Sequence, residues 1–480
     1  MWFARVTFGV SSSLFLLNAT IRHHLNQFCH THLEFVQMLL RSIYVDDISF
    51  GAESDDRAFE LFDKSKNLLA RGGFNLRKFV TNSKGLQERI DQREPCTDSM
   101  KNIKDTRVTA EDMTYAKDTL GSILFQGDHK VLGVTWRPVE DHLVFDLGSI
   151  ASHVRELEPT KRNIVGIATR FYDPLGFVSP ITIRFKMLFQ ELCENKVGWD
   201  EPLSGNLLSR WKSLASNFQG ISISIPRCYF NSVERSLSTS RLQGFCDAST
   251  GAYAAVVYLK IIAGTEVSVK FVASKTVSLV NKQTIPRLEL LAALLLAKLI
   301  TAISDALEPE ITLSEFICFT DSKVSLYWIR GMDKEWRLFV QNRVNEIRRL
   351  LPVNSWRHCP GKENPADIPS RGVSPLELSG STLWLHGPDW LAYPDLSIKE
   401  EELNMPDECL QEMKSKDRKL VHSMLTTEKS GISLSEIIDC EMFGDPHRLL
   451  RVTAYVLKFI NLLQHKIGRL AYPDLSQPRI

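Results

Sequence analysis

The stretch LQGFCDAST, residues 242–250, holds an apolar run of strand length that ends at Asp247. A second run of the same kind, EFICFT at residues 315–320, ends just before Asp321. In open α/β sheets, ligands bind beyond the carboxyl ends of the strands. Two acids in this setting therefore predict a functional site at one edge of a sheet.

A third acid, Glu289, lies inside the apolar helical pattern RLELLAALLLAKLI of residues 287–300. We expect its side chain to be largely buried, where an unpaired charge is costly. A fourth acid, Asp367, lies in the word NPADIPSR of residues 364–371. Converging carboxylates repel one another unless cations lie between them. Magnesium prefers oxygen ligands, and two such ions can activate water and stabilise the leaving oxygen in phosphodiester cleavage.

Each acid taken alone has a structural alternative. An Asp at the end of a strand is commonly a turn residue or the N-cap of a following helix. Asp321, which precedes Ser322 and Lys323, would suit an N-cap. His358, by contrast, invites the interpretation of a general base, although its predicted place is on a strand.

The periodicity of residues 241–372 predicts an α/β layer fold. We expect strands at about 242–247, 252–261, 266–274, 315–320 and 354–359, and helices at 287–304, 322–331, 337–351 and near Asp367.

The order of the four acids and the words around them resemble the ribonuclease H domain of Bel/Pao-type LTR retrotransposon polyproteins. The resemblance is carried by TIPRLEL at residues 284–290 and NPAD at residues 364–367. It implies metal-dependent cleavage of RNA in an RNA–DNA hybrid, with two Mg²⁺ ions, or Mn²⁺ as the alternative metal. The implied catalytic and metal-binding residues are Asp247, Glu289, Asp321 and Asp367. Three residues close to them in the sequence are candidates for contacts to nucleic acid: Ser249, Gln283 and Arg287.

The N-terminal third resembles the palm of a reverse transcriptase. SIYVDDISF, residues 42–50, is similar to the Tyr-x-Asp-Asp hairpin of these enzymes, so Asp46 and Asp47 are interpreted as a polymerase remnant. The family's first palm aspartate precedes the Phe8-Gly9 pair, and we expect no reverse transcriptase activity from this truncated chain. Downstream we expect a helix at 54–71, a strand at 74–80 and an irregular insertion at 82–128. Residues 130–136 resemble the hairpin that grips the primer strand, and we expect its return strand at 141–146.

The predicted fold class is therefore α/β and α+β, with a partial reverse-transcriptase palm and thumb followed by a ribonuclease H-like mixed sheet and its flanking helices. The expected segments are the palm at 1–150, a thumb and connection at 151–235, the ribonuclease H-like domain at 241–372 and a pre-integrase tail at 373–480 with a helix at 448–470. The connection resembles a segment catalogued as a Pao retrotransposon peptidase. An aspartic peptidase is disfavoured because no Asp-Thr/Ser-Gly word occurs, and Asp173 before Pro174 is interpreted as a turn residue.

Composition sets broad limits on the protein class. Of 480 residues, 44% are hydrophobic and 24% charged, which is ordinary for a globular protein, and the net charge is +1. Residues 241–372 contain 17 Lys and Arg against 13 Asp and Glu, a local excess of +4 that permits contact with phosphates. The nine cysteines form no C-x-x-C pair, so we expect an intracellular protein of the cytoplasm or nucleus, not a secreted one. We expect no membrane association, because no apolar run reaches the ~20 residues that a membrane span needs.

These observations lead to one principal hypothesis and one from another class. The principal hypothesis is a retrotransposon polyprotein fragment with metal-dependent ribonuclease H activity, whose partners are RNA–DNA hybrids and other products of the polyprotein. The alternative is a non-enzymatic, nucleic-acid-binding relic of a retroelement.

Overall fold

The computed structural model describes residues 12–93, 128–216, 218, 221–230, 238–279, 283–331, 335–394, 404–413, 450–451 and 454–455. By contacts, the chain divides into two compact units, Met1–Met413 and Lys414–Ile480. The Phe8-Gly9 pair and most of the helix expected at 448–470 lie outside the described residues.

The N-terminal part is mainly helical. Its elements are α1 (Ser13–Asn26), α2 (Cys29–Ser42), the two-residue strands β1 (Ile43–Tyr44) and β2 (Asp47–Ile48), α3 (Asp55–Ala70) and α4 (Lys84–Arg93). The Ser54 side chain caps α3 by accepting a hydrogen bond from the backbone N–H of Arg57. The hairpin expected at residues 42–50 is confirmed.

Two expectations for this part are wrong. Residues 84–93 are the helix α4, where we expected an irregular insertion; residues 94–127 lie outside the described residues. Residues 74–80 are not a strand, although their polarity alternates. Lys78 has a φ of 60°, which breaks the extended conformation that a strand requires.

A four-stranded antiparallel sheet follows, in the order β3-β4-β5-β6. Its strands are β3 (His129–Val131), β4 (Val134–Arg137), β5 (His142–Asp146) and β6 (Ser222–Pro226). The chain between β5 and β6 forms α6 (Gly148–Glu156), α7 (Lys161–Ala168), α8 (Ser179–Glu194) and α9 (Gly205–Ser216). The hairpin and its return strand are confirmed, whereas β6 was not expected.

The second sheet has five strands in the order β11-β10-β7-β8-β9. Strand β7 (Thr239–Ala248) pairs antiparallel with β8 (Ala252–Ala263), which pairs antiparallel with β9 (Glu266–Ser278). On its other side β7 pairs parallel with β10 (Leu313–Thr320), which pairs parallel with β11 (Trp356–His358). The helices are α10 (Ile285–Leu307), α11 (Lys323–Arg330), α12 (Leu338–Leu350), α13 (Asp367–Arg371), α14 (Pro375–Ser379) and α15 (Thr382–His386). The predicted α/β class and the expected order of elements in residues 241–372 are confirmed.

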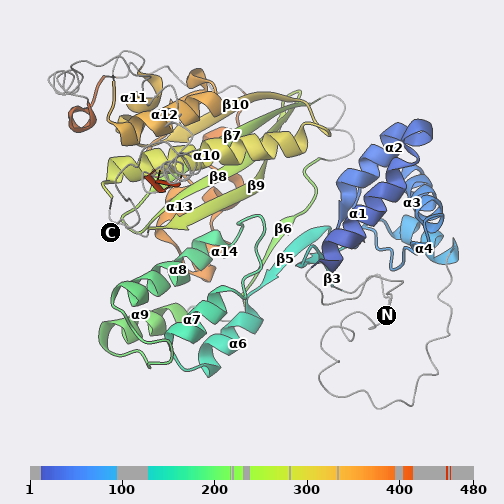
Figure 1. Cartoon of the computed structure of the whole chain (residues 1–480), viewed down its shortest axis with the longest axis horizontal. Coiled ribbons are helices and arrows are strands. Elements are labelled where there is room, and N and C mark those ends of the chain that lie inside the picture. Colours follow the sequence, from blue (N-terminus) through green and yellow to red (C-terminus); the bar gives the residue numbers. More distant parts are fainter. Residues whose placement is uncertain are drawn as a thin grey trace, which may run out of the picture. The chain divides into compact units, whose positions relative to one another are not determined.

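Both faces of this sheet are covered. Figure 1 shows α10 and α12 on one side and α8, α13 and α14 on the other. The first face forms a core of residues such as Leu242, Leu296 and Val344. The second face packs with α8 into a core that includes Phe245 and Phe271. The expected boundary between the connection and the ribonuclease H-like domain stays a prediction, but apolar residues from both segments share this core.

The loop before α8 docks on β9. The Asp173 carboxylate accepts hydrogen bonds of 2.8 Å from the N–H groups of Phe177 and Val178, which agrees with its interpretation as a turn residue. The N–H of Ser274 donates to the carbonyl of Leu175, and the Ser274 hydroxyl donates to that of Gly176. This approach leaves no space for a side chain at Gly176.

One described helix bears on the expectation of no membrane association, which stays a prediction. Within the part of the chain that the structure describes, α10 is long and apolar enough to cross a bilayer. Length and composition do not separate such a helix from the core helix of a folded domain. Leu290, Leu296 and Ile300 are completely buried in the core against the sheet, so we interpret α10 as a core helix.

Two glycines with positive φ test the docked loop. Gly176 has a φ of +74°, and an added Cβ would lie 2.0 Å from the carbonyl oxygen of Ser274. Gly264 has a φ of +63° and no atom within 4 Å of such a Cβ. Gly264→Ala should cost about 1–2 kcal/mol of unfolding free energy from backbone strain alone. Gly176→Ala should cost more than about 3 kcal/mol, because it also pushes the loop off β9. Chemical denaturation measures both, and equal losses would mean that the loop is not packed as described.

Candidate metal centre

Three acids from separate elements meet at the carboxyl end of the parallel strands. Asp247 lies near the end of β7, and Asp321 directly follows β10. Because Thr320 pairs with Cys246, the register of these strands brings the two acids together. Glu289 comes from the first turns of α10, which packs on β7. One carboxylate oxygen of each acid lies within 4.8 Å of the others.

Two of the three acids are buried and Asp321 is half-buried, and two of their oxygens lack a hydrogen bond to any described residue. Asp247 is 2% exposed and Glu289 is 6% exposed. Glu289 Oε2 and Asp321 Oδ1 are buried and have no hydrogen-bond partner among the described residues. Buried carboxylates in this state are unfavourable unless a proton or a cation neutralises them. Their oxygen donors and mutual spacing fit a hard divalent cation such as magnesium.

The same crowding changes the acidities. Burial raises the pKa of Glu289 to about 9, and the neighbouring charges of Asp247 and Asp321 add to this effect. Burial also raises the pKa of Asp247 to about 6, against the hydrogen bond from Ser370. The pKa of Asp321 is raised as well, chiefly by burial. Such a set of raised values in one place is typical of a functional site.

The fourth predicted ligand, Asp367, stands apart from this trio. It begins α13, its side chain is 37% exposed, and its Oδ1 accepts a hydrogen bond from Arg371 Nε. Its charge still contributes to the raised pKa values of Asp247 and Asp321, so it lies near them. The structure thus brings three of the four predicted ligands within reach of one ion, and holds the fourth at the edge in an ion pair. The role of all four stays a prediction.

The interpretation of Asp321 as a helix cap is wrong. Ser322 caps α11, because its side chain accepts a hydrogen bond from the backbone N–H of Ser325. The Asp321 side chain is therefore not the N-cap of α11. His358 ends β11 beside it, and the His358 charge opposes the rise in the pKa of Asp321.

The three candidates for nucleic-acid contacts have different surroundings. Gln283 is exposed just before α10. Ser249 Oγ donates to the carbonyl of Ser370 at 2.7 Å. Arg287 forms a 2.6 Å ion pair with Glu412. Gln283 is accessible, whereas Ser249 and Arg287 already have protein partners, and their contacts to nucleic acid stay predictions.

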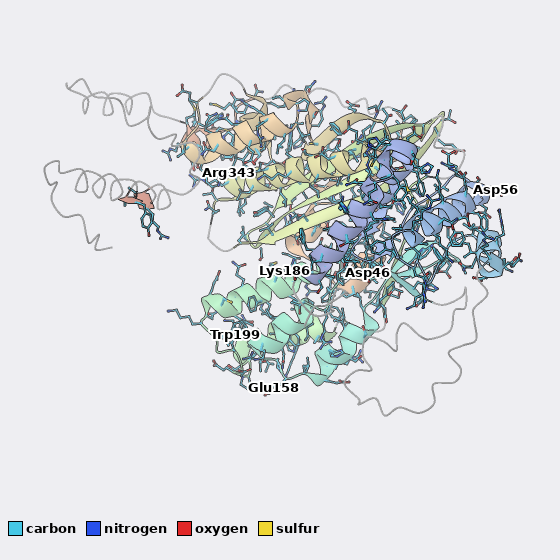
Figure 2. All side chains as sticks on the ribbon, turned by 45° about the vertical axis from the view of Figure 1, so that its right-hand side comes forward. Asp46, Asp56, Glu158, Lys186, Trp199 and Arg343 are labelled. Atoms are coloured by element: carbon cyan, nitrogen blue, oxygen red, sulfur yellow. The ribbon has the colours of Figure 1, made fainter. Side chains whose placement is uncertain are left out.

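Two arginines contact the aromatic ring of Phe339. The Arg287 guanidinium lies 4.6 Å from its centroid and that of Arg343, a residue labelled in Figure 2, lies 3.6 Å away. The contact with Phe339 and the ion pair with Glu412 hold Arg287 in the fold.

The predicted polymerase remnant is a separate feature. Asp46 and Asp47 are exposed at the tip of the β1–β2 hairpin; Asp46 is labelled in Figure 2. Asp47 pairs with Tyr44 across the hairpin. The pKa of Asp47 is raised, mainly by partial burial and to a smaller extent by the charge of Asp46. Among the described residues, neither belongs to a group of three acids that could hold a metal.

Family comparison identifies the domain that carries the trio. Residues 160–322 match the family described as the Pao retrotransposon-like RNaseH-like domain. The chain thus contains an RNase H-like domain. Over these residues the match confirms the resemblance to Pao-type retrotransposons noted in the sequence. The matched residues include Asp247, Glu289 and Asp321 and end before Asp367. No curated protein matches the chain.

Three solved structures are similar to parts of the chain. RNase H1 of the halophilic archaeon Halobacterium salinarum NRC-1 is 13% identical, over 27% of this chain and 90% of that chain, with a TM-score of 0.19. The N-terminal RNase H domain of a Mycobacterium tuberculosis protein, solved as a fusion with maltose-binding protein, is 13% identical, over 28% of this chain and 92% of that chain, with a TM-score of 0.19. A foamy viral protease–reverse transcriptase in complex with an RNA/DNA hybrid is 14% identical, over 85% of this chain and 43% of that chain, with a TM-score of 0.39. The chain spans less than half the length of this viral protein.

Two polar residues beside the trio were not predicted from the sequence. Asn364 is 1% exposed and its side chain donates to the carbonyl of Cys246 at 3.0 Å. Ser370 is completely buried and its hydroxyl donates to Asp247 Oδ2. Both belong to the NPADIPSR word, and the position of Ser370 three residues after Asp367, on the same side of a helical turn, was an available signal.

The raised pKa of Glu289 predicts how the metal-free protein responds to pH. Its folded-state pKa of about 9 lies above the ordinary 4.5, so the folded state holds the proton more tightly. The stabilisation is therefore complete below pH 4.5 and is lost as the pH rises towards 9. Glu289→Gln, which cannot ionise, should raise the unfolding free energy near pH 8 by at least about 1.4 kcal/mol, the equivalent of one pKa unit.

Thermal or chemical unfolding in a chelator, at several pH values, measures this difference. Glu266→Gln, a change at an exposed acid, serves as the matched control and should leave the pH profile unchanged. A Glu289→Gln protein that is less stable than wild type at pH 8 would contradict the proposed burial of an uncompensated charge.

Proposed function

We propose that this chain is a metal-dependent ribonuclease H that cuts the RNA strand of RNA–DNA hybrids. The carrying observation is the cluster of buried and half-buried carboxylates, in which Glu289 Oε2 and Asp321 Oδ1 have no hydrogen-bond partner within the described part of the chain. The match of residues 160–322 to an RNase H-like family supports the same activity. Two Mg²⁺ ions are the proposed cofactor, with Mn²⁺ as the alternative.

The chain's residues would divide the work by position. Asp247, Glu289 and Asp321 would hold the metal, and Asp367 would join them from the edge of the site. When bound, the metal would supply an activated water and charge stabilisation for the departing 3′ oxygen. Glu289, with a pKa of about 9, would release its proton when the metal binds, so the affinity should fall at low pH.

The proposed substrate requires a surface for a polyanion. The local excess of basic residues in 241–372 permits contact with phosphates, and it rises when cations neutralise the acidic cluster. Selection of the RNA strand would use contacts to 2′-hydroxyl groups. Other products of the retroelement polyprotein as partners, and a place in the cytoplasm or nucleus, are also part of the proposal.

Asp321→Asn tests the activity without removing a helix cap, because Ser322 caps α11. The substitution keeps the size of the side chain and removes one negative charge from the cluster. Cleavage of a labelled RNA–DNA hybrid with magnesium should fall by at least about 100-fold, while the fold is retained. Asp305→Asn, at an exposed position of α10, is the matched control and should cleave like wild type.

The alternative of a non-enzymatic relic makes a different prediction for the same assay. The wild-type chain would then bind the hybrid and leave it intact at every magnesium concentration. Unchanged cleavage in Asp321→Asn, with an active wild type, would instead remove Asp321 from the site.

A further inference from the structure

We propose that Ser370 is a positioning residue that sets Asp247 for metal binding and links it to the helix that carries Asp367. This inference rests on the proposed metal site. The Ser370 side chain is completely buried, and its hydroxyl donates to Asp247 Oδ2. The same hydroxyl oxygen lies 3.0 Å from the carbonyl oxygen of Asp367. Ser370 therefore touches one proposed ligand directly and the backbone of another.

A second serine holds this arrangement from the other direction. Ser249 Oγ accepts hydrogen bonds of 3.2 Å from the N–H groups of Gly251 and Ala252, which orients it in the turn after β7. It donates at 2.7 Å to the carbonyl of Ser370. The two serines thus join the end of β7 to α13 by one hydrogen bond in each direction. This is a more specific role for Ser249 than the nucleic-acid contact expected from the sequence.

The hydrogen bonds between α13 and the end of β7 hold Asp247 and the Asp367 helix in a fixed arrangement. Asp247 and Asp367 are far apart in the sequence, and α13 is a five-residue helix with little regular structure of its own to hold it. A carboxylate that turns freely must lose rotational freedom when it binds a cation, and this loss weakens affinity. Donation from Ser370 fixes one oxygen of Asp247 and leaves the other available. Groups that hold ligands in this way typically change metal affinity 10- to 100-fold when they are removed.

The test is a titration of the purified full chain with Mn²⁺ by calorimetry. Ser370→Ala should weaken Mn²⁺ binding by at least about 10-fold, because Asp247 loses its orienting donor. Ser370→Thr keeps a hydroxyl and should recover most of the affinity. Ser179→Ala removes another buried serine hydroxyl, hydrogen bonded to Ser274 instead of an acid, and should leave Mn²⁺ binding unchanged.

A dependence of cleavage on magnesium gives a second readout. Ser370→Ala should require a higher Mg²⁺ concentration for half-maximal rate and should approach the wild-type rate at saturation. A lower saturated rate with an unchanged Mg²⁺ requirement would overturn the positioning role. If Ser370→Ala does not fold, Ser249→Ala takes its place, and unchanged Mn²⁺ affinity in that variant would overturn the proposal.

Asp321→Asn separates this inference from the proposed function on which it rests. If Mn²⁺ binding is lost in Asp321→Asn and unchanged in Ser370→Ala, the metal site stands and the positioning role is wrong. If wild type and Asp321→Asn bind Mn²⁺ equally, the metal site itself is wrong, and the inference fails with it.

Discussion

The mutual repulsion of Asp247, Glu289 and Asp321 is the constraint around which this region is arranged. Parallel pairing of β7 with β10 brings two of these carboxylates to the same end of the sheet. Helix α10 then adds a third in a buried position. Packing of the apolar residues on α10 against the sheet fixes Glu289 where its charge is unfavourable. Burial energy from the core thus keeps together groups that would separate on their own, which is a common way for a fold to sustain a strained functional site.

The opposite face of the sheet supports the same site from below. Helix α8 and the loop before it pack on β9, and their core includes Phe177 and Phe271 in edge-to-face contact. The Trp384 indole N–H donates to the Phe177 carbonyl at 3.0 Å, so residues beyond α13 close this core. Short helix α13, which carries Asp367 and Ser370, lies between these layers. The position of Asp367 therefore depends on two segments, one that precedes the strands of this sheet in the sequence and one that follows them.

Much of this architecture was predictable because it repeats locally. The apolar runs of β7 and β10, the helical period of α10 and the acids at strand ends each leave a pattern within a few residues. Two local patterns were misleading or went unused. The Phe74–Val80 segment alternates like a strand but turns at Lys78. Strand β6 alternates Ser and Ile over residues 222–225, a strand pattern that was present in the sequence although the strand was not expected. The ion pair of Asp367 with Arg371 could have been inferred from their spacing of four residues.

The partners of the acids were less predictable. Nothing near Asp247 in the sequence indicates that Ser370 donates to it, since the two residues meet only through the packing of α13. The cap of α11 could not be assigned to either of two adjacent polar residues, Asp321 or Ser322, by sequence alone. Likewise, the capture of Arg287 by Glu412 joins residues from distant segments, and only the folded chain shows it. Sequence thus indicated which residues carry the chemistry, and folding decided how they are held.

The binding of divalent cations by the carboxylates of Asp247, Glu289 and Asp321 is the central claim about this site. The direct measurement is anomalous X-ray scattering from crystals of the chain soaked in Mn²⁺. Anomalous density is expected between these three carboxylates, and it should be lost in crystals of Asp321→Asn. Well-ordered crystals with these three side chains in place and no anomalous density between them, at saturating Mn²⁺ and neutral pH, would contradict this claim.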